Sequence, residues 1–249
     1  MILLGLACED EGHYLAITRL VDDALVRRHD WLMQETVEYC RTWRGYTEGT
    51  RWSKCTRDDD GPRVVKIDGR PVRLHGPIDG KSLAAGARMW RYVLSYFVQL
   101  VPRPDVVVLA QDGDGRQKER VQGLDQVRHA KDLRWPFAIV SAVPEPEIEA
   151  WHVAGFEPVN DAERTALAQV RADLSFDPRT ESHRLTSQPN DAVTDAKRVL
   201  ARLCGGDADR EAACLGDPAR LRSRGRANGT ADFLDEVDRH IAPLFGRPQ

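Results

Sequence analysis

Two aspartates that follow an apolar run are the residues of this chain with the clearest potential for chemistry. Asp112 and Asp114 are separated and followed by Gly113 and Gly115, directly after the apolar run 106–110. Glycine permits positive φ, so the backbone can turn tightly and both carboxylates can lean toward one point. Close carboxylates repel each other unless a cation lies between them, and oxygen ligands favour Mg²⁺, Mn²⁺ or Ca²⁺. Asp and Gly are also common turn residues, so a surface turn explains this stretch alone equally well.

Acidic residues also follow two other apolar runs. The run 2–8 is followed by Glu9, and the run 137–143 leads into a Pro-Glu-Pro-Glu-Ile-Glu stretch that contains Glu147 and Glu149. In open α/β sheets, ligands bind beyond the carboxyl ends of the strands. We therefore expect these acids to meet at one edge of a sheet. Acids at the start of a helix also complement its dipole, for about 0.3–1 kcal/mol each, and this alternative explains a single acid more easily than all of them.

The elements that must position these acids read as an α/β fold. The apolar runs lack polar alternation, which is typical of strands covered on both faces, as in a mostly parallel sheet. Apolar stripes over 17–25 and 90–101 predict flanking helices, the second ended by Pro102. Residues from about 30 to 80 do not continue this pattern of apolar strands and amphipathic helices. They predict an insertion that projects from the sheet, with a hairpin at 64–74 and a solvated loop at Asp58-Asp59-Asp60-Gly61.

The rest of the chain predicts a helical extension packed on an α/β core. We expect a core over residues 1–155 and a helical region over 156–249 packed on it, with helices at 166–174, 192–203 and 231–245. The net charge of −3 confines any polyanion site to a local patch. Five scattered cysteines without a CxxC pair favour reduced thiols in the cytoplasm. No apolar run approaches ~18 residues, so no membrane span is expected.

Basic residues near the acids and in the extension could hold phosphates. Arg116 and Lys118 open the helix after the acidic turn, where they oppose the helix dipole. The arginines at alternate positions of 220–226 cannot share one helix face, so we expect an extended or loop segment there. Arginine suits phosphate oxygens, which makes Arg222, Arg224 and Arg226 candidate contacts for nucleic acid. A solvated basic loop that pairs with nearby acids is an equal alternative.

The order of these motifs resembles the TOPRIM domain, the Mg²⁺-binding core of topoisomerases, primases and OLD-type nucleases. The stretches Cys8-Glu9-Asp10-Glu11-Gly12-His13 and Pro144–Trp151 are most similar to stand-alone TOPRIM-like proteins of the RloB group, found in bacterial defence and mobile regions. Asp10 and His13 stand where the first motif of that group has a glycine and a second glutamate. The resemblance covers roughly residues 1–30 and 85–155.

The resemblance implies a metal-dependent nuclease that acts on DNA or RNA in anti-phage defence. It implies that Glu9 is the acid/base glutamate and that Asp112 and Asp114 bind Mg²⁺ or Mn²⁺. Glu147 or Glu149 would be a further acid on the metal side. The resemblance also implies a catalytic role for Glu149 and a position near the metal for Glu9. The alternative is a non-catalytic partner module that works beside an ATPase from another chain. The oligomeric state, including a homo-oligomer, is left open.

Overall fold

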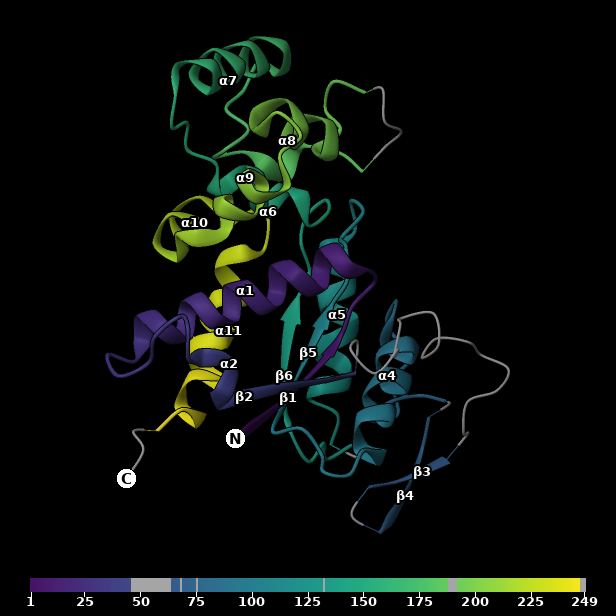
Figure 1. Ribbon diagram of the computed structural model, residues 1–249. Coiled ribbons are helices and arrows are strands. Elements are labelled where there is room, and N and C mark those ends of the chain that lie inside the picture. Colours follow the sequence, from purple (N-terminus) through teal and green to yellow (C-terminus); the bar gives the residue numbers. More distant parts are fainter. Residues whose placement is uncertain (46–63, 68, 75, 132, 188–191, 247–249) are drawn as a thin grey trace.

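A four-stranded parallel sheet forms the centre of the protein in the computed structural model, which describes residues 1–45, 64–67, 69–74, 76–131, 133–187 and 192–246 (Figure 1). The strand order is β2-β1-β5-β6. Three of these strands are the predicted apolar runs: β1 (Ile2–Ala7), β5 (Val106–Ala110) and β6 (Ala138–Ala142). All of β5 is buried, and it pairs in parallel with β1 on one side and β6 on the other. The predicted α/β class with a mostly parallel sheet is therefore confirmed.

Strand β2 (Arg41–Gly45) was not predicted, because it lies in the segment expected to project from the sheet. It pairs in parallel with β1 as the outer strand of the sheet. Its only large apolar residue, Trp43, is buried, while Arg41 forms an ion pair with Asp22 of the neighbouring helix. A short edge strand with charged residues carries little periodic signal, which explains why its sequence did not reveal it.

Helices cover both faces of the sheet (Figure 1). Helix α1 (Glu11–Arg28) and helix α11 (Thr230–His240) share one hydrophobic cluster with Val106 and Val108 of β5. Helices α4 (Ala87–Gln99) and α5 (Gln117–Arg128) share the opposite cluster with Val107 and Leu109. The alternation along β5 confirms that both faces of this strand are covered. Helix α11 comes from the extension, yet it packs against β6 and α1.

The hairpin predicted at 64–74 is confirmed. Strands β3 (Val64–Ile67) and β4 (Arg70–Arg73) pair antiparallel in a separate two-stranded sheet. The run Asp58-Asp59-Asp60-Gly61 lies outside the described residues. A short helix, α2 (Val37–Cys40), leads directly into β2.

A lobe of helices lies beyond the carboxyl ends of the strands (Figure 1). It contains α6 (Glu149–Gly155), α7 (Asp161–Leu174), α8 (Ala196–Cys204) and η3 (Cys214–Gly216), which contribute to a third hydrophobic cluster. Helix α9 (Ala208–Ala213) packs against α8 and η3. The turn η2 (Ser182–Arg184) lies before α8, and η4 (Ala242–Leu244) follows α11. The predicted helices at 166–174, 192–203 and 231–245 are thus confirmed in α7, α8 and α11, with shifted ends. No helix in the described parts of the chain combines the length and apolar character that a bilayer crossing requires.

The expectation of an extended segment at 220–226 is wrong. Helix α10 (Pro218–Arg224) occupies most of it. The Asp217 side chain accepts hydrogen bonds from the N–H groups of Ala219 and Arg220, and Pro218 fills the first helical turn. Such a cap and a proline at this position both favour helix initiation. The arginines do not need a common face, because each one finds a different partner around the helix.

Candidate active site at the carboxyl ends of the strands

The turns after β5 and β6 are joined by backbone hydrogen bonds. Gly113 N–H donates to Pro144 O at 2.7 Å, and Asp114 N–H donates to Pro146 O at 2.9 Å. Asp114 adopts a φ of 50°, which Asp tolerates better than most residues. These bonds hold the two acidic turns predicted from the sequence at the same edge of the sheet.

The side chain of Glu145 also links the two turns. Its carboxylate accepts hydrogen bonds from Gly115 N–H at 2.9 Å and from Gln117 N–H at 3.1 Å, at the start of α5. A carboxylate at a helix N-terminus satisfies free N–H groups and complements the dipole. A Cβ atom at Gly113 would lie 2.3 Å from Glu145 Oε2, so only glycine fits there without a shift. Both carboxylate oxygens of Glu145 are therefore used in holding the two turns together.

A buried histidine connects the acids at the ends of β1 and β5. His13 donates from Nδ1 to Asp10 Oδ1 at 2.8 Å and from Nε2 to Asp112 Oδ1 at 3.0 Å. Burial alone would lower the pKa of His13, but the hydrogen bonds and charges of both aspartates outweigh it and raise the pKa to about 10. The same hydrogen bond lowers the pKa of Asp10 to about 2. His13 is therefore an imidazolium at neutral pH, held between two carboxylates.

Asp112 has the position expected for a central acid. Its Oδ1 accepts hydrogen bonds from His13 and, at 3.0 Å, from Ile148 N–H after β6. No described residue forms a hydrogen bond to its Oδ2. The side chain is 16% exposed, so the carboxylate reaches the surface of the cluster while remaining anchored. The end of β5 is thus tied to elements that follow both β1 and β6.

Glutamates near Asp112 are held in an environment that opposes their charge. Burial, followed by the charge of Glu149, raises the pKa of Glu147 to about 7. Burial also raises the pKa values of Glu9 and Glu149, with the charge of Asp112 adding to the effect at both. Lys197 of α8 lies 3.4 Å from Glu147 Oε2, and the charges of Glu149 and Glu147 raise its pKa despite its partial burial. The positive charges of Lys197 and His13 are fewer than the negative charges that Glu9, Asp112, Glu147 and Glu149 would carry if all were ionised.

Three buried oxygen atoms in this region have no hydrogen-bond partner. They are Gln111 Oε1, Glu147 Oε1 and Glu149 Oε2. An unpaired buried acceptor is unfavourable, and oxygen atoms of this kind are suitable ligands for a hard divalent cation. Within the described ranges, no three His, Cys, Asp or Glu side chains are already grouped as a metal site. Mg²⁺ usually keeps several waters and is held through one or two carboxylates, so the donor chemistry fits this ion without a closed protein cage.

Asp114, predicted as the second metal ligand, has different partners from Asp112. Its Oδ2 accepts a hydrogen bond from Arg120 at 2.6 Å, and Ser187 lies 3.3 Å from its Oδ1. Its side chain is 42% exposed. The glycine-flanked turn therefore directs one carboxylate inward and the other toward α5. A direct metal contact by Asp114 would require it to leave Arg120.

The predicted phosphate-binding residues are dispersed. Arg116 precedes α5, and Lys118 lines an open cavity of about 660 Å³ between α5 and α11 that acidic residues also border. Arg222 forms ion pairs with Asp235 and Asp238, and Arg224 bonds Glu157 and the carbonyls of Ala154 and Phe156. Arg226 is exposed, and its charge acts on Asp232. Arg222 and Arg224 thus hold the extension together, whereas Arg116 and Lys118 directly follow the acidic turn in sequence.

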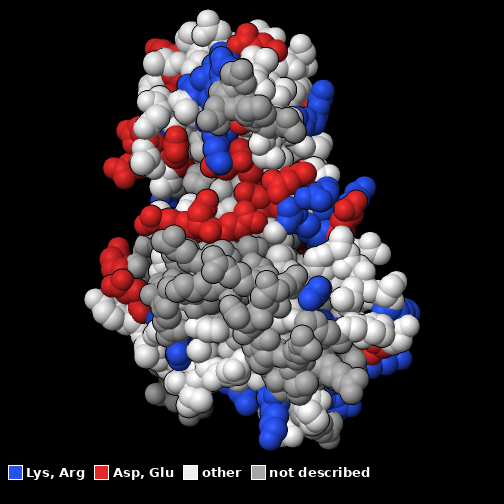
Figure 2. Space-filling view, turned by 90° about the vertical axis from the view of Figure 1, so that its right-hand side faces the viewer, with Lys and Arg blue, Asp and Glu red and all other residues white. Residues whose placement is uncertain are grey.

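The surface view agrees with this distribution. Figure 2 shows a band of Asp and Glu across the waist between the helical lobe and the sheet, with Lys and Arg gathered at one end of it. The carboxyl ends of β5 and β6 point toward this waist (Figure 1). A negatively charged phosphate would need a cation to approach the middle of the band.

Two residues at the site were not assigned a role from the sequence. His13 was noted only as a departure from a motif, although the spacing Asp10-x-x-His13 places Asp10 at the N-cap of α1 and His13 on its first turn. Lys197 comes from α8, which is distant in sequence from every acid that it neutralises. Local spacing could have indicated the first contact, whereas the second depends on the packing of the lobe.

Comparisons of the chain with models of protein families, with curated proteins and with solved structures find no match.

Proposed function

We propose that this chain is a TOPRIM-like, metal-dependent phosphodiesterase that hydrolyses nucleic acid. The observation that carries the proposal is the excess of buried carboxylate at the carboxyl ends of the strands, including unpaired oxygens of Glu147 and Glu149. Attack at a phosphate builds negative charge, which a divalent ion neutralises while it lowers the pKa of a bound water. Such an ion would also offset the mutual repulsion of the acids.

The residues have different proposed roles. Asp112, through Oδ2, and the glutamates Glu147 and Glu149 would hold Mg²⁺ or Mn²⁺. Glu9 would accept and return a proton, because its raised pKa lies closer to neutral pH than the pKa of an exposed glutamate. Asp114 would join the metal ligands on leaving Arg120. Arg116 and Lys118 would hold the phosphate backbone beside the turn.

The direct test is cleavage of supercoiled plasmid and of structured RNA with Mg²⁺ or Mn²⁺. Asp112→Asn should abolish cleavage, because it removes the charge at the centre of the cluster while keeping the side-chain shape. The matched control is Asp161→Asn on α7, whose side chain is 96% exposed and forms an ion pair with Arg164. Equal rates for Asp112→Asn and Asp161→Asn, or no cleavage by the wild type with either metal, would overturn the proposal.

The resemblance noted above extends the proposal to anti-phage defence in a bacterial cytoplasm. Bacteria that express the chain should form fewer plaques on phage challenge than bacteria that express Asp112→Asn. Equal plaque numbers, with cleavage intact in the purified protein, would remove the defence role and leave the chemistry.

A second function is favoured by the position of His13. Its imidazolium already bridges Asp10 and Asp112, so a cation supplied by the protein itself partly neutralises the cluster. This arrangement suits a non-catalytic module that works with an ATPase from another chain. Calorimetric titration with Mn²⁺ separates the two functions: binding that Asp112→Asn abolishes supports the enzyme, and the absence of binding supports the module.

A further inference from the structure

Two cysteines of the helical lobe lie in contact. Cys204 is the last residue of α8 and Cys214 the first of η3, and their Sγ atoms are 3.8 Å apart. Both are reduced and buried, with exposures of 6% and 1%. A disulfide has an S–S bond of about 2.05 Å, so the sulfurs need to approach by less than about 2 Å. The connection between α8 and α9 contains Gly205 and Gly206, both with positive φ, and a Cβ at either position would meet no atom within 4 Å. This open connection can absorb such a shift.

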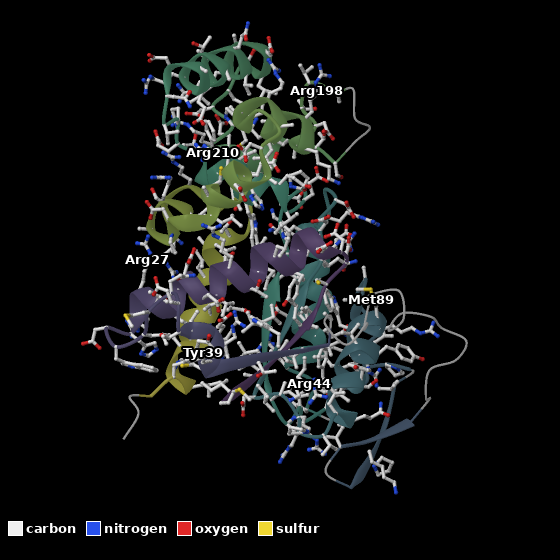
Figure 3. All side chains as sticks on the ribbon, in the orientation of Figure 1. Arg27, Tyr39, Arg44, Met89, Arg198 and Arg210 are labelled. Carbon is white, nitrogen blue, oxygen red and sulfur yellow. The ribbon has the colours of Figure 1, made fainter. Side chains whose placement is uncertain are left out.

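The surroundings of the two thiols differ. The Cys204 hydrogen bond lowers the pKa of Cys214, and the positive charge of Arg210 adds to the effect. The same interaction raises the pKa of Cys204. Arg210 lies in the helical lobe (Figure 3). Its Nη1 lies 3.6 Å from Cys214 Sγ, and the guanidinium is fixed by Glu163 and by the ring of Phe156. Cys214 is therefore the thiol of the pair that ionises first, and the thiolate is the reactive form.

A buried cysteine elsewhere provides a contrast. Burial, with the charges of Asp10 and Glu9, raises the pKa of Cys8 to about 12. No second described cysteine is in contact with it. Cys8 thus has neither the activating cation nor the partner thiol that Cys214 has.

We propose that Cys204 and Cys214 form an oxidisable dithiol that a small peroxide converts into a disulfide. The Cys214 thiolate attacks one peroxide oxygen, the O–O bond breaks, and the products are Cys214 sulfenic acid and, after protonation, water or an alcohol. The Cys204 sulfur then attacks the Cys214 sulfur, the S–S bond forms and the S–O bond breaks. The sulfenic hydroxyl leaves as water after it takes up the proton lost by the Cys204 thiol. The two sulfurs are oxidised and the peroxide is reduced. Because both sulfurs are buried, a small peroxide fits better than a bulky disulfide.

The bond would fix one wall of a cavity next to the candidate active site. A cavity of about 220 Å³ is lined by residues of α8, α9 and η3, including Leu200 and Leu215, and by Glu149 and His152. His152 Nδ1 donates at 2.9 Å to the carbonyl of Glu211, which lies between the two cysteines in sequence. Oxidation therefore ties together the segments that support this side of Glu149.

The test is peptide mapping of the full chain after treatment with hydrogen peroxide, without reduction. The expected result is loss of two hydrogen atoms and an intramolecular link between the peptides of Cys204 and Cys214. Cys204→Ala, with Cys204→Ser as a second variant, should accumulate sulfenic acid at Cys214, trapped by a sulfenic-acid reagent. Arg210→Gln should slow disulfide formation about tenfold for each unit by which the thiol pKa rises, and Arg210→Lys should retain much of the rate. Cys8→Ser is the matched control and should leave the link unchanged.

Two outcomes would overturn the dithiol. One is a link pattern dominated by other cysteines in protein that keeps its far-UV dichroism. The other is no 204–214 link at peroxide levels that oxidise exposed methionines. Nuclease activity does not enter this test, so its result is separate from that of the proposed function.

Discussion

Carboxylates in two regions of this molecule have opposite environments. In the helical lobe, Glu157 and Glu163 are each paired with arginine, and hydrogen bonds from Arg224 and Arg210 lower their pKa values. At the carboxyl ends of the strands, burial raises the pKa values of Glu9, Glu147 and Glu149. Each of these two lobe acids thus has a cation beside it, whereas the strand ends hold more acid than their own cations neutralise.

The difference separates charges that support the fold from charges that oppose it. Paired and hydrogen-bonded carboxylates contribute to stability, while buried acids in excess reduce it. Residues that reduce stability are common where a protein binds a ligand or performs catalysis. The comparison therefore predicts that the same chemical change, Glu→Gln, has opposite consequences in the two regions.

The largest effect is expected on catalysis at Glu9. Glu9→Gln keeps the size of the side chain and removes its proton transfer, which is worth about 10²–10⁴-fold in rate. Metal affinity should stay within a few fold, since Glu9 is assigned to the proton and Asp112 to the ion. Cleavage rates and Mn²⁺ calorimetry on one preparation measure both. Loss of metal binding equal to that of Asp112→Asn would make Glu9 a ligand.

The next effect is stabilisation by metal. A divalent ion at a hundredfold its Kd should raise the free energy of unfolding by about 2.7 kcal/mol. Asp112→Asn should lose this gain, whereas Glu163→Gln in the lobe should keep it. Thermal unfolding with and without millimolar Mg²⁺ or Mn²⁺ gives the answer. A melting temperature indifferent to both metals in the wild type would contradict a metal site.

Replacement of a paired acid in the lobe should destabilise the protein. Glu163 accepts from Arg210 Nε at 2.9 Å and from Val159 N–H at 2.9 Å, and its side chain is 12% exposed. Glu163→Gln should cost about 1–3 kcal/mol at pH 7, because Arg210 loses its charged acceptor. The folded state lowers the pKa of Glu163. Its contribution to the free energy of unfolding is therefore present above the ordinary glutamate pKa and is lost as the pH falls through the pKa of the folded state. Urea titrations at pH 7 and pH 4 should show a smaller difference at the lower pH.

The same substitution at Glu147 should stabilise the protein instead of destabilising it. The folded pKa of about 7 lies above the ordinary value of 4.5, so the wild type loses stability as the pH rises between these values. Without metal, the free energy of unfolding of Glu147→Gln should therefore exceed that of the wild type above pH 7 by on the order of 1–3 kcal/mol. The two values should converge near pH 4. Urea unfolding in the presence of a chelator measures the difference. A variant less stable than the wild type at pH 8 would show that the Lys197 contact outweighs burial.

The smallest effect concerns the basic residues. Lys118→Gln should weaken nucleic-acid binding a few fold and reduce the salt slope by about 1, as expected for one phosphate contact. Arg222→Gln should leave the slope unchanged, because Asp235 and Asp238 already engage this guanidinium. Binding of a labelled duplex at several salt concentrations compares them. Equal slopes for both variants would remove Lys118 from the interface.

The sequence predicted those parts of the fold that have a strong local pattern. The buried strands β1, β5 and β6 and the helices α1 and α4 were evident from continuous or periodic apolar residues. Strand β2 was not, because Trp43 alone does not make a pattern. At the site, the grouping of Glu9, Asp112, Glu147 and Glu149 was expected because each acid follows an apolar strand of one parallel sheet. Lys197 comes from the distant helix α8, so its contact with Glu147 depends on tertiary packing that no local spacing contains. The Arg120 partner of Asp114 is local, because α5 begins directly after the acidic turn.

Helix α11 has a consequence for how the protein is made. It covers the same sheet face as α1, yet it follows all four strands of the sheet in sequence. During synthesis from the N-terminus, Val106, Val108 and Val140 are translated long before Phe233 and Leu234 can shield them. The nascent sheet therefore presents an apolar surface that a chaperone can recognise until α11 leaves the ribosome.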